Sequence, residues 1–263
     1  RAVTAFGILA RHVDQARLWN RHEALAAFGA TAAGGVNRQA LSDEDIAGRR
    51  QLLEWARPLG LAAFHDPAGN LFLRLSGADP DLPPVLCGSH IDSQPTGGKY
   101  DGVYGVLAAL EAIEAMREAG HVPSRSVEVV AWMNEEGSRF APGMMGSEAF
   151  AGLRPLDAIK EVRDVGGVAA GAALDRVLAA FPEVERRPLG FPVHAFVEAH
   201  IEQGPELDAA GIPVGVVTGI QGKKTFQVRV DGTEGHAGTT PRRLRRDALR
   251  AAAAMIDALH RAF

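Results

Sequence analysis

The stretch VLCGSHID, residues 85–92, decides the fold expected for this chain. Its first three residues form a short apolar run typical of a buried strand, and Gly88 lets the chain turn at the end of that strand. Because α/β proteins bind ligands at the carboxyl ends of their strands, we expect His90 and Asp92 at the mouth of a pocket. The segment therefore predicts an α/β sheet with polar side chains along one edge.

Two further segments pair an apolar strand with polar residues. Residues 127–133 are rich in β-branched and apolar side chains, and the motif NEEG, residues 134–137, follows them directly. Over residues 195–201 the side chains alternate in polarity, so a period of two puts His200 on the more polar face of a strand. Three strands whose polar groups converge predict one functional pocket.

The polar residues at these strand ends are of the types that bind divalent metals. Imidazole nitrogens and carboxylate oxygens suit zinc, manganese, cobalt or nickel. A single histidine or glutamate is more often a surface or core residue than a ligand, but several such residues at converging strand ends favour a metal site. The candidate ligands are His90, Asp101, Glu136 and His200. Asp101 has two carboxylate oxygens, so it could bridge two ions and share a bound hydroxide between them.

Local patterns predict the elements around these motifs. Ser42 is a good N-cap, and the residues after it predict a helix that runs to about Leu59. Residues 61–75 predict a hairpin, because a turn sequence interrupts two apolar runs. The Ala- and Leu-rich segments 103–119 and 172–181 predict further helices.

Composition indicates a folded protein rather than a disordered or nucleic-acid-binding one. The chain has 263 residues, of which 46% are hydrophobic and 23% charged, with a formal net charge of −4. The densest basic cluster, residues 242–246, is interpreted as a solvated helix face. The one cysteine, Cys87, cannot form an internal disulfide and is expected to pack in a strand. No apolar stretch of about 18 residues is present, so we expect a cytoplasmic protein that contacts neither membrane nor nucleic acid.

Several longer motifs give the chain a family resemblance. They are GSHID (88–92), GGKYDG (97–102), NEEG (134–137), RFAPGMMGS (139–147), HIEQG (200–204) and GHAGTTP (235–241). With them, the chain resembles the hydantoinase/carbamoylase branch of the M20-type dinuclear metallohydrolase clan over nearly its whole length. Members include N-carbamoyl-L-amino acid hydrolases, β-ureidopropionases and allantoate amidohydrolases. Related peptidases tend to have an acidic residue in place of His200, which favours the amidohydrolase branch.

The resemblance implies a fold and a domain organisation. It implies a three-layer αβα catalytic domain with a mixed sheet, over residues 1–218, followed over residues 219–263 by the start of an α+β lid and dimerisation domain. Alternating residues in 225–231 predict a one-sided strand, and the apolar stripe from Leu244 to Phe263 predicts a helix. The family pattern also includes a later return to the catalytic domain with a last histidine ligand. We therefore expect both domains to be incomplete in this chain.

The resemblance also implies a dinuclear centre. His90, Asp101 and His200 would bind one ion, and Asp101 and Glu136 would bind the other. We expect two divalent ions, with zinc as the first candidate and manganese, cobalt or nickel as alternatives. Since the second ion has only two ligands in this chain, we expect it to be bound more weakly. Asp92 would orient the imidazole of His90 through a hydrogen bond.

Catalytic roles follow from the same resemblance. Glu135 would be the general base, which takes a proton from water and hands it to the departing nitrogen. His236 would stabilise the developing oxyanion, and in a homodimer formed through the lid it would act on the partner's active site. Gln203 and His236 would contact a small ureido or carbamoyl substrate. Glu135 as an additional metal ligand remains the alternative to its role as a base.

Three functions stay open at this point. The first is hydrolysis of a linear amide or ureido C–N bond in N-carbamoyl amino acids, allantoate or β-ureidopropionate. The second is a metallo-aminopeptidase of the same clan, and the third is an inactive truncated metal-binding fragment. Replacing Glu135 by Gln separates the third from the others, because a binding protein without catalytic activity would lose nothing. We expect the first.

Overall fold

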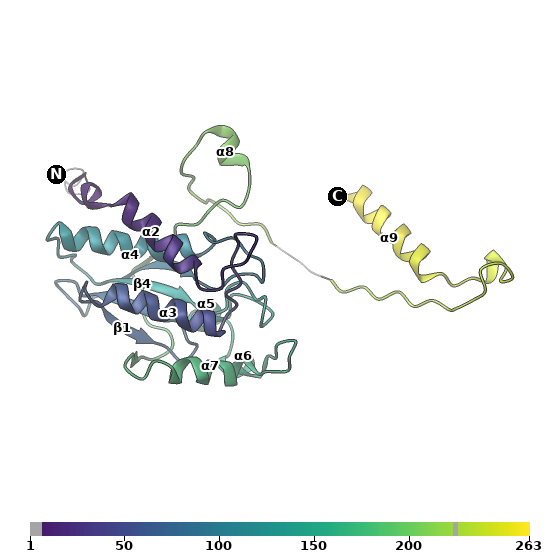
Figure 1. Cartoon of the computed structure of the whole chain (residues 1–263), viewed down its shortest axis with the longest axis horizontal. Coiled ribbons are helices and arrows are strands. Elements are labelled where there is room, and N and C mark those ends of the chain that lie inside the picture. Colours follow the sequence, from purple (N-terminus) through teal and green to yellow (C-terminus); the bar gives the residue numbers. More distant parts are fainter. Residues whose placement is uncertain (1–6, 223–225) are drawn as a thin grey trace. The chain divides into compact units, whose positions relative to one another are not determined.

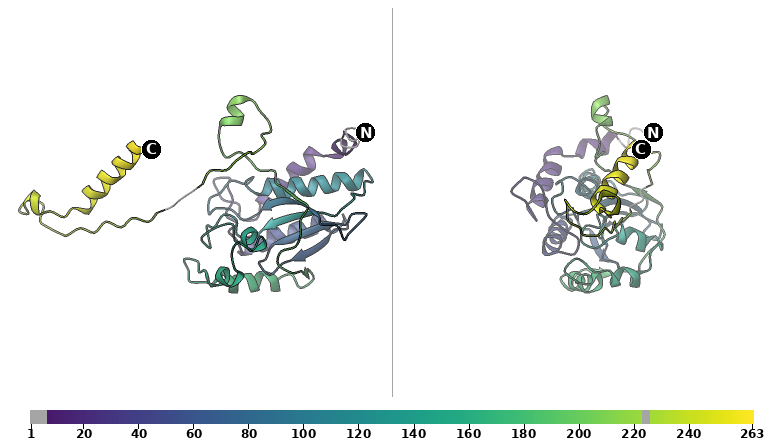
Figure 2. Two further views of the ribbon diagram at one scale, coloured as in Figure 1. Left: turned by 180° about the vertical axis from the view of Figure 1, so that it is seen from behind. Right: turned by 90° about the vertical axis from the view of Figure 1, so that its right-hand side faces the viewer.

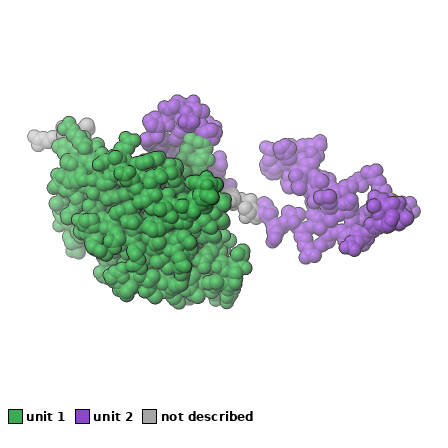
Figure 3. Space-filling model, viewed as in Figure 1, with its two compact units in different colours: residues 1–204 green, residues 205–263 purple. Residues whose placement is uncertain are grey.

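The chain forms two compact units in a computed structural model that describes residues 7–222 and 226–263. One unit covers residues 1–204 and the other residues 205–263 (Figure 3). The larger unit contains a sheet and most of the helices, whereas the smaller one contains short helical segments and a single long helix. The predicted division into a catalytic domain ending at residue 218 and a lid domain stays a prediction.

A mixed sheet forms the centre of the larger unit. Within the described residues it has six strands, which are β1 (Ala62–His65), β2 (Leu71–Leu75), β3 (Val85–His90), β4 (Val127–Trp132), β5 (Glu185–Arg186) and β6 (Ala195–Val197). Their order across the sheet is β5-β1-β2-β4-β3-β6. Strand β3 runs parallel to both β4 and β6, while β2 is antiparallel to β1 and to β4. The predicted α/β class with a mixed sheet is confirmed, and the carboxyl ends of β3, β4 and β6 share one edge.

Helices connect and cover these strands. The described helical segments are η1 (Ala10–His12), α2 (Gln15–Ala26), α3 (Asp43–Ala56), α4 (Val103–Glu118), α5 (Met145–Phe150), α6 (Leu156–Glu161), α7 (Ala170–Ala179), α8 (Glu206–Ala210), η2 (Arg242–Leu244) and α9 (Ala248–Ala262). Helix α3 lies in front of the sheet in Figure 1 and behind it in the rear view of Figure 2. Ser42 caps α3 as predicted, since its hydroxyl accepts a hydrogen bond from the amide of Asp45 at 3.2 Å. The helix ends three residues before the predicted Leu59.

The two faces of the sheet bury different side chains. One face packs aliphatic residues of β2 and β4 against Leu52 of α3 and against α4 residues such as Leu107 and Leu110. The opposite face carries a smaller aromatic cluster in which Phe72 and Trp132 contact Phe150 of α5. Because both faces are covered, the strands read as nearly continuous apolar runs in the sequence.

Strand β3 differs from its prediction at Gly88. The strand does not turn there but continues through His90. A Cβ atom on Gly88 would lie 2.0 Å from the carbonyl oxygen of Val130 in the neighbouring strand. The glycine is therefore needed because β4 approaches closely, and the chain turns only after the strand has delivered His90 to the edge of the sheet.

Two other predicted strands are shorter or absent. The strand predicted over residues 195–201 ends at Val197, where its pairing with β3 stops. Residues 226–231, the described part of the strand predicted over 225–231, form no strand; residue 225 lies outside the described residues. A strand needs a neighbour for its backbone hydrogen bonds, and the described part of the smaller unit offers none. Helix α9 agrees with its prediction, although it begins at Ala248, after Leu244. Nowhere in residues 7–222 and 226–263 is a helix long and apolar enough to cross a membrane.

Candidate metal centre

Three segments of the larger unit bring together a His/Asp/His group. His90 ends β3, Asp101 precedes α4, and His200 follows β6. One ligand atom from each of these residues lies within 4.8 Å of the others. The Asp101 Oδ1 atom is 3.2 Å from Nε2 of His200 and 4.0 Å from Nε2 of His90. The structure thus assembles three of the four predicted ligands around one point.

The His90 ring is held from two sides. Its Nδ1 atom is 2.9 Å from the main-chain carbonyl oxygen of Asp92, so a proton on Nδ1 leaves Nε2 free to bind a metal. On the opposite side, Gly102 lies so close that a Cβ atom there would be 2.4 Å from the imidazole. Asp92 is the predicted orienting partner of His90. Its main-chain carbonyl lies 2.9 Å from Nδ1, and its carboxylate Oδ1 atom lies 3.6 Å from the same nitrogen. Orientation of the ring by the carboxylate itself stays a prediction.

A tight turn positions Asp101. The amide of Val103 donates to the carbonyl of Asp101 at 2.6 Å across Gly102, whose φ is +65° and ψ is −47°. These values are close to a classic γ-turn, which side chains other than glycine rarely adopt. The Asp101 Oδ2 atom accepts a hydrogen bond of 2.6 Å from Nε2 of Gln203. Gln203 was predicted as a substrate contact, and here it lies against a candidate ligand.

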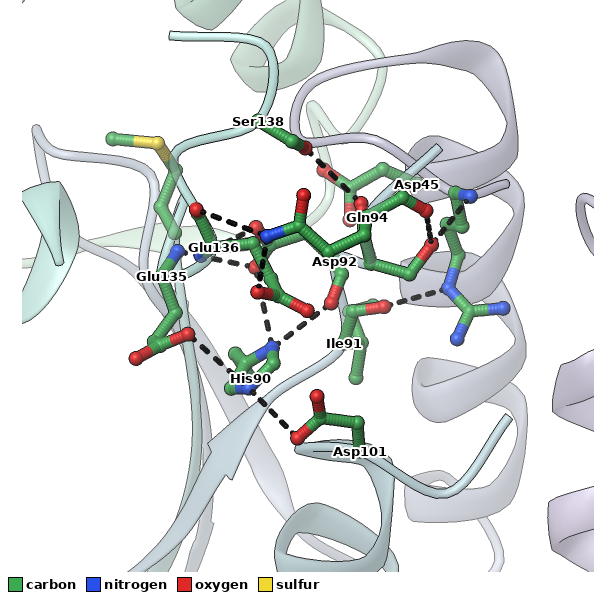
Figure 4. A network of polar contacts seen from close by, with 12 residues as sticks. Asp45, His90, Ile91, Asp92, Gln94, Asp101, Glu135, Glu136 and Ser138 are labelled. Carbon is green, nitrogen blue, oxygen red and sulfur yellow. Dashed lines mark hydrogen bonds and ion pairs between the residues drawn. The ribbon is translucent and has the colours of Figure 1, made fainter. Parts of the chain in front are cut away.

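The carboxylate of Asp92 connects two strand ends. It is 3% exposed, and it accepts hydrogen bonds from the amides of Glu135 at 3.2 Å and Glu136 at 3.1 Å (Figure 4). Burial raises the pKa of Asp92 to about 6, although the nearby charge of His90 opposes this shift. The turn after β4 is in this way tied to the turn after β3.

Glu135 lies beside the candidate ligands. Its Oε2 atom is 3.4 Å from Nε2 of His90, and Figure 4 shows the His90 ring between Glu135 and Asp101. Burial raises the pKa of Glu135, against the charge of His90, and the negative charges of Glu136 and Asp101 add to the increase. A carboxylate with a raised pKa close to the ligands is suited to accept a proton from water.

Glu136 is not part of the His/Asp/His group. Its Oε2 atom accepts a hydrogen bond of 2.7 Å from Nε2 of Gln94. Its assignment as a ligand of a second ion stays a prediction.

His236 belongs to the smaller unit. Its Nδ1 atom accepts hydrogen bonds from the amides of Gly238 at 3.0 Å and Thr239 at 3.1 Å. A neutral imidazole that accepts at Nδ1 carries its proton on Nε2. The ring is thus prepared to donate a hydrogen bond, as its predicted role requires.

Sequence reasoning missed two residues next to these groups. Gln94 contacts Glu136, and the buried Arg38 donates a hydrogen bond to the carbonyl of Ile91, between His90 and Asp92. Arg38 is the one charged residue in segment 35–42, and this was the only sign in the sequence that it could have a specific structural role.

The donor set fits a divalent cation. Two imidazole nitrogens and one carboxylate oxygen form the type of site that leaves a coordination position open for water or substrate. The carbonyl that engages His90 Nδ1 and the Gly102 backbone that leaves room for the ring both direct Nε2 toward Asp101. The cluster therefore has the chemistry of a catalytic rather than a closed structural metal site.

Comparisons with known proteins point to one family. A profile described as "Peptidase family M20/M25/M40" matches residues 86–262. The N-carbamoyl-L-amino-acid amidohydrolase of Rhizobium meliloti is 42% identical over 248 residues, which cover 94% of this chain and 59% of that protein. The allantoate amidohydrolase of Bacillus subtilis (strain 168) is 38% identical over 238 residues, covering 90% and 57% respectively.

A solved structure is similar as well. A hydantoinase/carbamoylase family amidase from Burkholderia ambifaria matches with a TM-score of 0.78 and 45% sequence identity. The match covers 95% of this chain and 61% of that one. The chain thus spans less than two thirds of the length of these relatives.

Proposed function

Because this chain belongs to peptidase family M20/M25/M40, we propose that the full-length protein which carries it is a metal-dependent amidohydrolase. It cleaves a linear C–N bond in N-carbamoyl amino acids or in related ureido compounds. The observation that carries the proposal is the His90, Asp101 and His200 group with Glu135 at 3.4 Å from His90. The names of the similar proteins, an N-carbamoyl-L-amino-acid amidohydrolase and an allantoate amidohydrolase, support this substrate class.

His90, Asp101 and His200 would hold one divalent ion, and Asp101 with Glu136 would hold a second. Zinc is the first candidate, and manganese, cobalt and nickel are compatible with the same nitrogen and oxygen donors. A bound divalent ion polarises the scissile carbonyl and lowers the pKa of water at the site. Asp92 holds the main-chain amides of Glu135 and Glu136, so the base and the second carboxylate keep a fixed relation to His90.

Glu135 would move the proton during hydrolysis. Its Oε2 atom accepts a proton from the attacking water, whose oxygen forms the new bond to the carbonyl carbon. The same carboxyl group then donates that proton to the nitrogen as the C–N bond breaks. Because burial and neighbouring negative charge raise its pKa, Glu135 holds the proton more readily than a solvated glutamate does.

Gln203 and His236 would bind the substrate. The amide of Gln203 already donates to Asp101, which places it at the rim of the candidate centre. His236 carries a donor at Nε2 and would stabilise negative charge on the carbonyl oxygen. In the homodimer that we propose, it would serve the active site of the partner. A cytoplasmic location is part of the same proposal, since the single cysteine suits a reducing compartment.

Ammonia release tests the substrate class. The full-length protein, loaded with zinc or manganese, would be incubated with N-carbamoyl-L-amino acids, allantoate and β-ureidopropionate, and separately with dipeptides. We expect ammonia release from at least one ureido compound, and no release of free amino acids from the dipeptides, whose cleavage produces no ammonia. Cleavage of dipeptides alone would assign a peptidase, and no turnover of any compound would leave a metal-binding protein.

A pair of variants tests the role of Glu135. Glu135→Gln should lower kcat by about two to four orders of magnitude, because it cannot accept the proton, while metal stoichiometry is kept. Glu148→Gln is the matched control, since Glu148, on α5, has a similar side-chain exposure but pairs with Arg154. Equal activities of the two variants would refute the assignment of the base.

A further inference from the structure

Arg38 is a charged side chain in the interior of the larger unit. Its exposed fraction is 1%, and it precedes α3 in the chain. Its Nε atom donates a hydrogen bond of 2.7 Å to the carbonyl of Ile91, and its Nη1 atom donates to the carbonyls of Leu25 at 2.8 Å and Phe28 at 2.9 Å. The guanidinium therefore links the end of α2 to the residue between His90 and Asp92.

The main chain of Arg38 binds the same segment. Its amide donates to the hydroxyl of Ser93 at 2.9 Å, and its carbonyl accepts from the amide of Ser93, also at 2.9 Å. Together with the bond to Ile91, these contacts hold the chain on both sides of Asp92. They fix the direction of the Asp92 carbonyl, which binds His90, and that of its carboxylate, which binds the turn after β4.

Packing does not account for an arginine at this position. Burying a guanidinium is unfavourable, and an apolar side chain of similar volume is often as stable or more stable. Burial lowers the pKa of Arg38, and the negative charges of Asp45 and Asp92 act against that shift. An aliphatic residue would fill the space but would leave the carbonyl of Ile91 without its donor.

We propose that Arg38 is a positioning residue of the metal centre. It holds residues 91–93 so that Nε2 of His90 faces Asp101 and the carboxylate of Asp92 faces the amides of Glu135 and Glu136. The proposal rests on the proposed metal-dependent function in one respect, which is the use of metal affinity as a readout. The position of the His90 ring can be measured without metal, so the two proposals can fail separately.

The test compares variants of this chain at a temperature where circular dichroism shows each of them folded. Arg38→Met removes the three side-chain hydrogen bonds and keeps the main-chain bonds to Ser93, and Arg38→Lys keeps the charge and one donor group. Arg187→Met is the control, because it also removes a largely buried arginine, one that donates to Glu128 at 2.7 Å near the opposite end of β4. Affinity for Zn²⁺ is measured by chelator competition, and the coordination of Co²⁺ by its visible absorption.

We expect Arg38→Met to weaken Zn²⁺ binding about tenfold or more and to change the Co²⁺ spectrum. The Zn²⁺ affinity of Arg38→Lys should lie between those of Arg38→Met and the parent. Arg187→Met should bind Zn²⁺ within about twofold of the parent, since the contacts of Arg187 lie away from the ligands. Unchanged affinity in Arg38→Met would overturn the proposal. So would an equal loss of affinity in Arg187→Met, because the effect would then be one of general stability.

The Arg38→Lys variant and the imidazole NMR signals keep the proposal testable in two further cases. If Arg38→Met does not fold, Arg38→Lys decides, and a parent-like affinity and spectrum in that variant would overturn it. If the parent binds no Zn²⁺, the metal proposal fails, but the ¹⁵N shifts of His90 still report the ring's position. They should then change in Arg38→Lys and stay constant in Arg187→Met, and the opposite pattern would refute the role of Arg38.

Discussion

Replacing Gly102 by Ala tests whether backbone space at this one position determines metal binding. Gly102 has a φ of +65°, and a Cβ atom there would lie 2.4 Å from the His90 ring. Gly120 provides a matched control at the other end of α4. Its φ is +63°, and a Cβ atom there would have no neighbour within 4 Å. The two substitutions thus impose a similar positive φ on alanine but differ in what the new methyl group meets.

The structure sets the size of the expected difference. An L-residue in the left-handed region costs about 1–2 kcal/mol of stability, and Gly120→Ala should lose roughly this amount. Gly102→Ala should lose more, because its φ of +65° and ψ of −47° are those of a strained γ-turn. In Gly102→Ala the contact is about 1 Å shorter than the ordinary distance of about 3.5 Å, so the ring must move by about 1 Å. Metal–ligand distances tolerate only about 0.2 Å. Nε2 of His90 is then lost as a ligand, and we expect affinity to fall at least about tenfold.

Two measurements on each variant separate stability from binding. Urea unfolding gives the free energy of unfolding, and chelator competition gives the Zn²⁺ dissociation constant. We expect a larger loss of stability in Gly102→Ala than in Gly120→Ala, with a Zn²⁺ affinity that is reduced in Gly102→Ala and unchanged in Gly120→Ala. If Gly102→Ala binds Zn²⁺ as well as Gly120→Ala does, the packing of the ring against Gly102 is not what positions His90.

Three further predictions concern stability, pH and metal removal. Gly88→Ala should unfold the protein or cost at least about 3 kcal/mol in urea unfolding, whereas Gly98→Ala, where a Cβ atom has no neighbour within 4 Å, should change little. Burial lowers the pKa of His65 to about 3. As the pH falls below about 6.5, His65 is therefore protonated in the unfolded chain but stays neutral in the folded chain, which favours unfolding. The stability advantage of the parent over His65→Gln should therefore shrink by about 2 kcal/mol between pH 6.5 and 4.5; a constant difference would contradict the assignment. Removing metal with a chelator should accelerate amide hydrogen exchange in residues 198–204 more than in β3, and equal changes in both would argue against His200 as a ligand.

Much of the fold follows from local sequence patterns. Ser42 determines where α3 begins, and residues 61–75 form the predicted hairpin because a turn sequence separates two short apolar runs. The resemblance of the motifs to the hydantoinase/carbamoylase branch is confirmed by the relatives and by the similar solved structure. His90 and His200 lie together because the parallel strands β3 and β6 end at the same edge, and the turn before α4 adds Asp101 to them.

The features that sequence patterns did not predict depend on contacts between distant segments. Gly88 resembles a turn residue in the sequence, but a glycine is needed there because a carbonyl of β4, about forty residues away in the chain, leaves no room for a Cβ atom. The carbonyl of Asp92 lies closer to His90 than its carboxylate does, and the carboxylate also binds two amides that follow β4, about forty residues further along the chain. Arg38 donates to carbonyls, and hydrogen bonds to the main chain leave no pattern of residue types to recognise.

The three ligands of the candidate centre are held to unequal degrees, which has consequences for how a metal binds. His90 is 2% exposed and fixed by Asp92 and Gly102, whereas the side chain of His200 is 33% exposed. The Nδ1 atom of His200 lies 2.7 Å from the carbonyl of its own neighbour, Ile201, and the strand before it pairs with β3 over only three residues. Long-range contacts prearrange His90, while His200 depends on the position of a short edge strand. We therefore expect a bound metal to restrain residues 198–204 more than it restrains β3, and variants that stabilise β6 to raise metal affinity without contacting the ion.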